Sequence, residues 1–454
     1  MNADERSFFI MEIVTILLVA ISSFLLLTEL FPLTTMFDIQ LVLYLTILVL
    51  DYLRVKSFTF FQIWIVGFIF IVWSEMRITS SGYLGALYTI PYVRFSLANF
   101  LLLLGYHTCQ NKKIIFHNKV CDISKTNWLF TFIIIILYLI YVSQSARSAI
   151  VNLQYGRQLS SAKGSSTLTG ALISALGTIL PAIIAYHVKY VKGKNSVISF
   201  VYSLPIFIIL LLQSTRFRFL FSVMPFLIVV GVLNFGKADR KKNVILLICV
   251  ILMVSVSSFV KSNRNMAFAE IENPSLFDKE TTNRTDPLTL KIAKQMSPEG
   301  ILRMAYYADE YFLDHPLHYG KEMSFIFYFW VPRSIWPNKP TQLDYWLIRE
   351  CSSEVVADSY SSASGFIGEA RADFGWGCLL LAFFLGVLFK KIDDYKDIIW
   401  TYYRQSFNIV LIAILVPWAF FFVRSPLTST MSLIWELILY YLFVRFFSTP
   451  FPTN

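Results

Sequence analysis

The stretch TFIIIILYLIYV, from Thr131 to Val142, decides the fold because it contains no charged residue, glycine or proline. A membrane-spanning β-strand would alternate apolar and polar positions over about ten residues. In lipid, every backbone N–H and C=O group must be hydrogen-bonded within the protein, which a helix achieves by itself. The continuous apolar run therefore predicts a membrane-spanning helix rather than a barrel strand.

Similar runs recur along the whole chain. Of the 454 residues, 56% are hydrophobic and only 15% are charged, whereas a soluble domain carries about 25% charged residues. The sequence therefore predicts an all-α polytopic membrane protein with about twelve transmembrane helices. We place the spans near residues 13–31, 39–53, 58–74, 87–106, 128–143, 168–188, 197–213, 218–235, 243–260, 376–389, 407–423 and 429–447.

The first apolar run lacks a basic leader and a small-residue cleavage site, so we interpret it as a retained span. The polar segment 261–375 interrupts the spans and divides the chain into three parts. We expect helices 1–9 within residues 1–260, one large and partly helical loop over 261–375, and helices 10–12 within 376–454.

Lysine and arginine residues set the predicted orientation. Twelve spans place both termini on one side, and alternate connections carry most of the basic residues. Cytoplasmic connections show such an excess, so we assign these connections and both termini to the cytoplasm, and the 261–375 loop to the outside. The basic connections hold Arg54 and Lys56; Lys112, Lys113, Lys119 and Lys125; Lys189, Lys192 and Lys194; Lys237, Arg240, Lys241 and Lys242; and Lys390, Lys391, Lys396 and Arg404.

Arginines in outward-facing positions are the main chemical feature. A guanidinium group is planar, permanently charged and binds phosphate oxygens in pairs, so several around one outer cavity would suit a lipid-linked pyrophosphate. The alternative is that these side chains extend toward lipid headgroups. Arg216 favours a ligand, because a charge between two apolar spans is costly without a partner. The cationic candidates are Arg147, Arg157, Arg216, Arg218, Arg303, Arg333, Arg371 and Lys339.

Two histidines and one carboxylate are candidates for substrate binding or proton transfer. His315 and His318 lie in DHPLHYG. An imidazole can act as a base near neutral pH. The alternative is that these residues end a helix, since His and Gly are both favoured at helix C-termini. Glu369 precedes span ten and could accept a proton from a sugar hydroxyl, or could instead join a charge network with Arg371. No CxxC, HExxH, P-loop or GxGxxG motif occurs, so we predict no metal and no nucleotide cofactor.

Four local features resemble the bacterial O-antigen polymerases, the Wzy-type polymerases of oligosaccharide repeat units. The resemblance is strongest over roughly residues 210–380 and includes the large outer loop late in the chain. The features are the turn Ser214-Thr215-Arg216, Arg303 followed by DHPLHYG at 314–320, the run PRSIWPNKP at 332–340, and Gly368-Glu369 followed by Phe374-Gly375-Trp376-Gly377.

This resemblance implies a GT-C-like fold in the bacterial inner membrane and metal-independent glycosyl transfer at its periplasmic face. The growing glycan would leave its undecaprenyl pyrophosphate as a hydroxyl of a new repeat unit attacks. Arg216 and Arg303 would stabilise the pyrophosphate, with Glu369 as the base. The implied partners are undecaprenyl-pyrophosphate-linked glycans, membrane lipid and a chain-length-regulating co-polymerase, with no nucleic acid.

Three alternatives remain open. An O-antigen ligase would share the chemistry, but the ligase branch has a histidine just before the final Phe-Gly segment, where this chain has residues 360–364, YSSAS. A lipid-linked oligosaccharide flippase would be expected to have internal repeats and polar residues at mid-membrane, and we find no repeat. The third alternative is a non-enzymatic partner of a co-polymerase.

Overall fold

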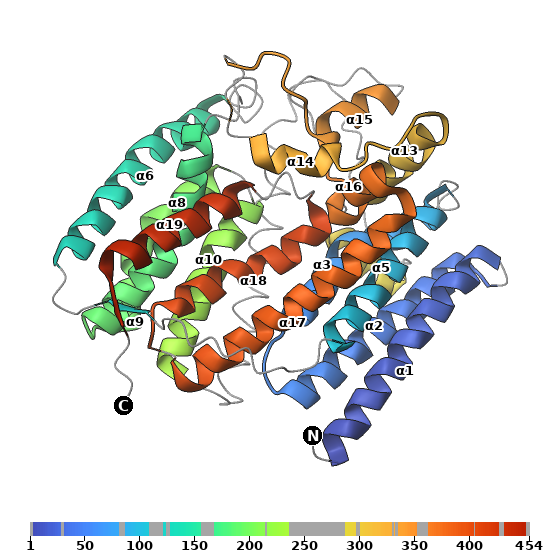
Figure 1. Cartoon of the computed structure of the whole chain (residues 1–454), viewed down its shortest axis with the longest axis horizontal. Helices are drawn as coiled ribbons and strands as arrows, with labels where there is room; N and C mark the ends of the chain where they lie inside the picture. Colours follow the sequence, from blue (N-terminus) through green and yellow to red (C-terminus); the bar gives the residue numbers. More distant parts are fainter. Residues whose placement is uncertain are drawn as a thin grey trace. The chain divides into compact units, whose positions relative to one another are not determined.

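The computed structural model describes residues 3–28, 31–80, 87–108, 121–123, 128–155, 168–213, 216–235, 287–296, 300–328, 331, 335–351, 362–403, 405–425 and 431–450. These residues are helical apart from their connections and one short ladder of two strands (Figure 1). The chain forms two compact units. Unit 1 comprises Met1–Gln110, Pro274–Asp393 and Ala419–Thr430, and unit 2 comprises Asn111–Asn273, Asp394–Trp418 and Met431–Asn454.

Each predicted span falls on a helix except the ninth, 243–260, which lies outside the described residues. The first part of the chain forms α1 (Ala3–Leu25), η1 (Leu26–Thr28), α2 (Leu33–Val55), α3 (Phe60–Phe68), the π-helix η2 (Ile69–Trp73), α4 (Ser74–Thr79), α5 (Thr89–Thr108), α6 (Trp128–Tyr155), α8 (Leu168–Tyr186), the π-helix η4 (His187–Val191), α9 (Ser196–Leu212) and α10 (Arg216–Phe235). The later part forms α12 (Leu288–Met296), α13 (Ile301–Asp314), α14 (Lys321–Tyr328), α15 (Leu343–Cys351), α16 (Gly365–Phe374), η5 (Gly375–Gly377), α17 (Cys378–Tyr402), α18 (Asn408–Arg424) and α19 (Met431–Phe447).

Among the residues that the structure describes, six helical segments are long and apolar enough to cross a membrane: Arg6–Thr28, Leu33–Val55, Phe60–Thr79, Trp128–Arg147, Leu172–Val191 and Gly365–Tyr402. Large apolar side chains on these helices remain exposed, such as Ile21 on α1 and Leu139 on α6, which are 54% and 58% exposed. Contiguous apolar surface of this kind is costly in water and favourable against lipid. The described helices are therefore those of a helical membrane protein.

Helix α5 carries polar residues within the predicted fourth span. Arg94 is only 2% exposed, and its Nη2 donates to both carboxylate oxygens of Asp309 on α13, at 2.6 and 2.7 Å. A buried guanidinium is tolerated because it is paired in this way. Pro91 lies in the first turn of α5, where a missing N–H costs little.

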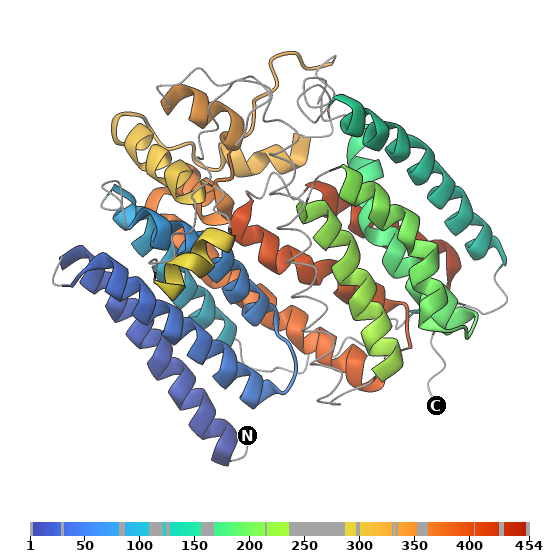
Figure 2. The ribbon, with the colours of Figure 1, turned by 180° about the vertical axis from the view of Figure 1, so that it is seen from behind.

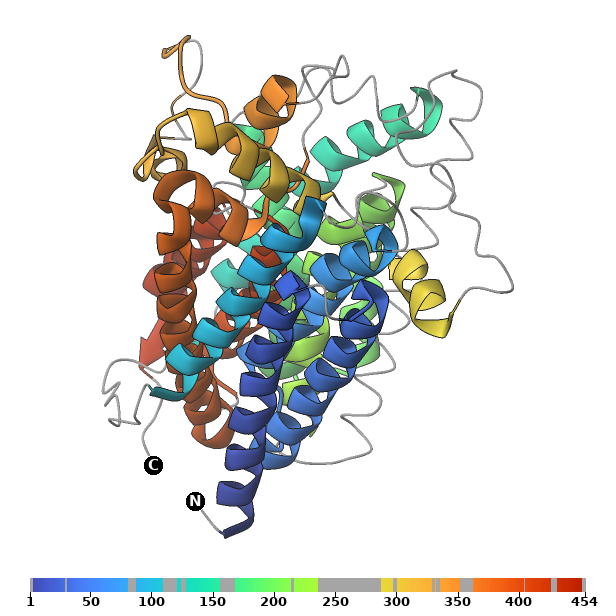
Figure 3. The same cartoon turned by 90° about the vertical axis from the view of Figure 1, so that its right-hand side faces the viewer.

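Helices α5 and α17 pack with their backbones in close contact in unit 1. A Cβ atom on Gly386 would lie 1.8 Å from the carbonyl oxygen of Leu102, and one on Gly105 would lie 2.0 Å from that of Phe383. Only glycine permits this approach. Small residues that let two helices meet so closely are typical of interfaces between membrane helices. Figure 3 shows α17 continuing in orange from α16.

The described part of the polar segment 261–375 forms a small helical layer in unit 1. The sequence Pro298-Glu299-Gly300 predicts a break in the helical pattern here, and α12 indeed ends at Met296 and α13 begins at Ile301. Helix α12 packs against α4 (Figure 2). There Arg77 Nη2 donates to Thr289 Oγ1 at 3.1 Å. Helices α13, α15 and α16 share an apolar core of Met304, Ala308, Phe312, Leu343, Leu347, Ile348 and Ala372.

Unit 2 is built mainly from α6, α8, α9, α10 and α19. The ring of Phe130 on α6 packs edge-on against Phe407 and Phe443. Strand β1 (Cys121–Ile123) pairs antiparallel with β2 (Ser448–Pro450), with Asp122 opposite Thr449. The carboxyl group of Glu436 on α19 is buried and accepts a hydrogen bond from Trp418 Nε1 at 3.1 Å.

Candidate functional site

The start of α16 is the point in unit 1 where several helix ends meet. Gly365 has φ +68°, and a Cβ atom there would lie 2.5 Å from the carbonyl oxygen of Val423 on α18 and 2.8 Å from Ile301 Cδ1 on α13. Glycine is required both for this backbone conformation and for the close approach. The N–H of the preceding residue, Ser364, donates to Asp344 Oδ1 on α15 at 3.1 Å. Residues far apart in sequence are thus brought together.

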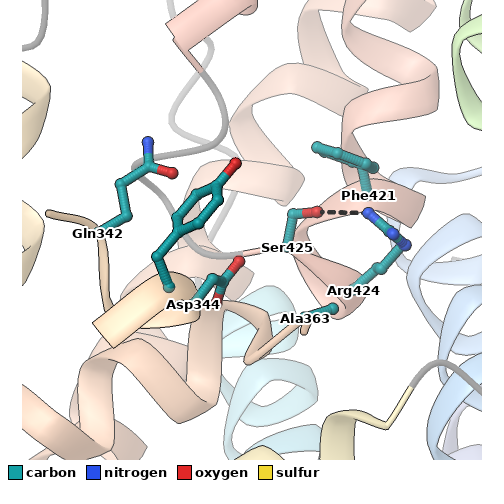
Figure 4. Close-up of a pocket in the computed structure, with 7 residues that line it drawn as sticks. Gln342, Asp344, Ala363, Phe421, Arg424 and Ser425 are labelled. Carbon is teal, nitrogen blue, oxygen red and sulfur yellow. Dashed lines mark hydrogen bonds between the residues drawn. The ribbon is translucent and has the colours of Figure 1, made fainter. Parts of the chain in front are cut away.

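A pocket of about 120 Å³ lies beside this junction. Figure 4 shows Arg424 and Ser425, at the end of α18, on one side of it and Asp344 on the other. Arg424 Nη1 donates to Ser425 Oγ at 3.2 Å, and the guanidinium lies 5.8 Å from the centroid of the Phe421 ring. The pocket combines a cation, a carboxyl group and neutral polar side chains. Its lining residues are Gln342, Asp344, Tyr345, Ala363, Phe421, Arg424 and Ser425.

Burial raises the pKa of the Asp344 carboxyl to about 7. The hydrogen bonds from Ser364 and the positive charge of Arg424 act in the opposite direction, and the negative charge of Glu322 adds to the increase. Loss of solvation disfavours the charged form, and here it outweighs the nearby cation. A carboxyl group with such a pKa exchanges protons near neutral pH, which is what general acid–base catalysis needs.

Arg303 lies in the first turn of α13 and is partly buried. The Ile301 N–H at the start of this helix donates to Glu75 Oε2 on α4 at 2.8 Å, and Arg303 lies close enough to interact electrostatically with Glu75. A carboxylate at a helix N-terminus is favoured by the helix dipole. Arg303 is therefore held near the junction by a buried acidic group.

Arg371 forms an ion pair inside the protein. Its Nε donates to Asp309 Oδ1 at 2.9 Å, so one carboxylate bridges Arg371 on α16 and Arg94 on α5. The guanidinium of Arg94 also lies 4.9 Å from the centroid of the Trp376 ring. The sequence interpretation placed Arg371 either at a phosphate or beside Glu369, and the structure gives it Asp309 as a partner.

Glu369 is completely buried on α16 and is not among the pocket-lining residues. Lys339 is also buried: its Nζ donates to the carbonyl oxygen of Val331 at 2.9 Å and lies 5.4 Å from the centroid of the Phe325 ring. This contact fixes the proline-rich turn that follows α14. Arg333, predicted in the same run, lies outside the described residues.

The two histidines have structural partners near the end of α13. His315 is the C-cap residue; its ring stacks on Tyr311 with centroids 4.1 Å apart, and its Nδ1 lies 2.9 Å from the Tyr311 carbonyl oxygen. His318 Nδ1 lies 2.8 Å from Glu322 Oε1. Burial raises the pKa of Glu322, whereas the hydrogen bond from His318 opposes that increase. These contacts support the helix-terminus alternative for His315.

Arg147 and Arg218 belong to unit 2, where both are exposed, on α6 and α10 respectively. Arg218 interacts electrostatically with Tyr141 on α6. The backbone of Arg216 starts α10, directly after the short connection predicted from the sequence. Arg157 lies outside the described residues. The structure thus brings Arg303, Glu369 and Arg371 into unit 1, and Arg147 and Arg218 into unit 2.

Sequence reasoning did not select Asp344 or Asp309. Neither belongs to a motif, and each acquires its role from partners distant in the chain. Arg94 did carry a signal, because it is a charge within an apolar stretch and such residues usually have a partner. Arg424 carried a weaker signal, because it is the residue that ends an apolar span.

Comparisons with protein-family models, with curated proteins and with solved structures found no match to this chain.

Proposed function

We propose that this protein is a polymerase of oligosaccharide repeat units, acting at the periplasmic face of the bacterial inner membrane. The observation that carries the proposal is the pocket in which Arg424, at the end of the apolar helix α18, faces Asp344 from the outer loop. A polar pocket at the end of an apolar helix would suit the charged group that joins a lipid tail to a sugar-bearing head. The proposal includes twelve spans, cytoplasmic termini and a GT-C-like arrangement.

In the proposed reaction, a hydroxyl oxygen of the acceptor unit attacks the anomeric carbon of the lipid-linked donor. The bond from that carbon to the pyrophosphate oxygen breaks, and undecaprenyl pyrophosphate leaves with the electron pair. Arg424 in the pocket and Arg303 in the same unit would stabilise the negative charge of the leaving group, as preorganised cations do in other phosphate chemistry. Holding both lipid-linked substrates in one membrane plane supplies proximity.

The test is gel analysis of surface and lipid-linked glycan from cells that lack the gene. These cells should accumulate single repeat units, and the wild-type gene should restore long ladders. Arg424→Ala should fail to restore them although the protein is present in the membrane. The matched control is Arg445→Ala, since Arg445 is exposed in the last turn of α19 and is not among the residues that line the pocket.

Other results would support the alternatives. Single units trapped at the cytoplasmic face would indicate a flippase, and intact polymer retained on undecaprenyl pyrophosphate would indicate a ligase. Normal ladders in variants of every outward arginine would favour a non-enzymatic partner of a co-polymerase.

A further inference from the structure

We infer that Asp344, rather than Glu369, is the general base that accepts the proton of the attacking hydroxyl. This inference rests on the proposed glycosyl transfer and assigns the proton-accepting step within it. A catalytic base must lie within hydrogen-bond reach of its proton in a plausible substrate position. Asp344 lines the pocket and is 7% exposed, whereas Glu369 is 0% exposed and does not line it.

The local structure orients the Asp344 carboxyl group. The Ser364 N–H fixes Oδ1 at 3.1 Å, and the Ser362 N–H donates to the backbone carbonyl of Asp344 at 3.3 Å. Leu343 and Leu347, on the same helix, are fully buried in the core with α13 and α16. A carboxyl group held by one hydrogen bond, on a helix whose backbone is itself bonded and packed, keeps its orientation through the reaction.

The pocket also places complementary groups beside this carboxyl. Arg424 supplies a cation for the leaving pyrophosphate, and Gln342, Tyr345 and Ser425 supply neutral donors and acceptors for sugar hydroxyls. As the new glycosidic C–O bond forms, the acceptor O–H bond breaks and its proton passes to the Asp344 carboxylate. The proton is then released to solvent, which restores the ionised base for the next cycle.

The raised pKa of Asp344, about 7, agrees with this role. Only the ionised carboxylate accepts a proton, so kcat/KM of the wild-type protein should rise with pH through about 7 and then level off. Glu369 does not line the pocket, so its ionisation would not produce this rise of kcat/KM with pH.

The test uses the purified full-length protein in lipid nanodiscs with undecaprenyl-pyrophosphate-linked repeat units as the probe. Asp344→Asn keeps an oxygen that can accept the Ser364 N–H, so it should fold, but it should lower kcat by about 100-fold or more and lose the rising limb of the pH profile. Glu369→Gln should retain that limb. Asp314→Asn, at an exposed residue that ends α13, is the matched control and should behave as wild type.

The outcomes separate the two proposals. If the wild-type protein forms no polymer, the proposed function is overturned, and this inference with it. If the wild type polymerises and Asp344→Asn keeps its rate and pH profile, only the assignment of the base is overturned. Should Asp344→Asn fail to fold, the wild-type profile decides, because a rate independent of pH around 7 contradicts the assignment.

Discussion

The substitution Asp309→Asn tests the ion-pair network that joins α13 and α16 to α5. Asp309 accepts three charge-assisted hydrogen bonds, two from Arg94 and one from Arg371, whose side chains are 2% and 11% exposed. Removing one partner of a buried ion pair costs about 3–5 kcal/mol, because the remaining charge is left without compensation. Two cations depend on this carboxylate, so we expect a loss of stability in that range.

The assay is thermal unfolding of the purified protein in detergent. A loss of about 3 kcal/mol corresponds to a decrease in Tm of roughly 6–12 °C for a unit of this size. Asp314→Asn is the control, since it removes a carboxylate at an exposed position on the same helix and should change stability by less than about 0.5 kcal/mol. Adding Arg94→Met to Asp309→Asn should recover part of the loss by removing the buried cation.

Equal Tm values for Asp309→Asn and Asp314→Asn would refute this reasoning. That result would mean that water or another group already compensates Arg94 and Arg371, and that the carboxylate does not join α13 and α16 to α5.

Two further predictions concern helix packing and the arginines. Gly386→Ala should destabilise the protein by about 3 kcal/mol or more, beyond ordinary overpacking, because the added methyl group would meet the backbone of Leu102. Leu380→Ala, at an exposed residue of α17, is the control. Equal decreases in Tm for the two variants would contradict the close packing of α5 and α17. Arg216→Ala should abolish polymer formation while the protein still inserts into the membrane. Lys192→Ala, in a predicted cytoplasmic connection, should leave polymer formation unchanged. Long polymer from cells with Arg216→Ala would exclude a role of Arg216 in pyrophosphate binding.

The helices could be predicted from the sequence because their cause is local. Each apolar run must satisfy its own backbone hydrogen bonds in lipid, whatever lies around it. The break near Gly300 was also predictable, since Gly300 adopts φ +75° directly before α13. The ends of such elements depend on residues within a few positions of the boundary, and these are visible in the sequence.

The polar contacts could not be predicted in the same way, since they depend on tertiary packing. Arg94 and Asp309 are 215 positions apart, and Glu75 meets the start of α13 across 226 positions. Asp344 looks like an ordinary first-turn carboxylate in sequence, and it becomes a buried group with a raised pKa only when Ser364 and the end of α18 pack around it. A single sequence gives no information about such pairs.

The structure also separates arginines that the sequence could only group together. A phosphate that bound Arg371 would compete with the Asp309 carboxylate, which is fixed in place by Arg94 as well. Arg424 faces a different neighbour: burial raises the pKa of the Asp344 carboxyl, so this group compensates the guanidinium charge less fully than an ordinary carboxylate would. An anion therefore gains more from Arg424 than from Arg371. By the same electrostatics, an anion bound there would favour the protonated form of Asp344, so departure of the pyrophosphate would help the carboxyl group to release the proton it has accepted.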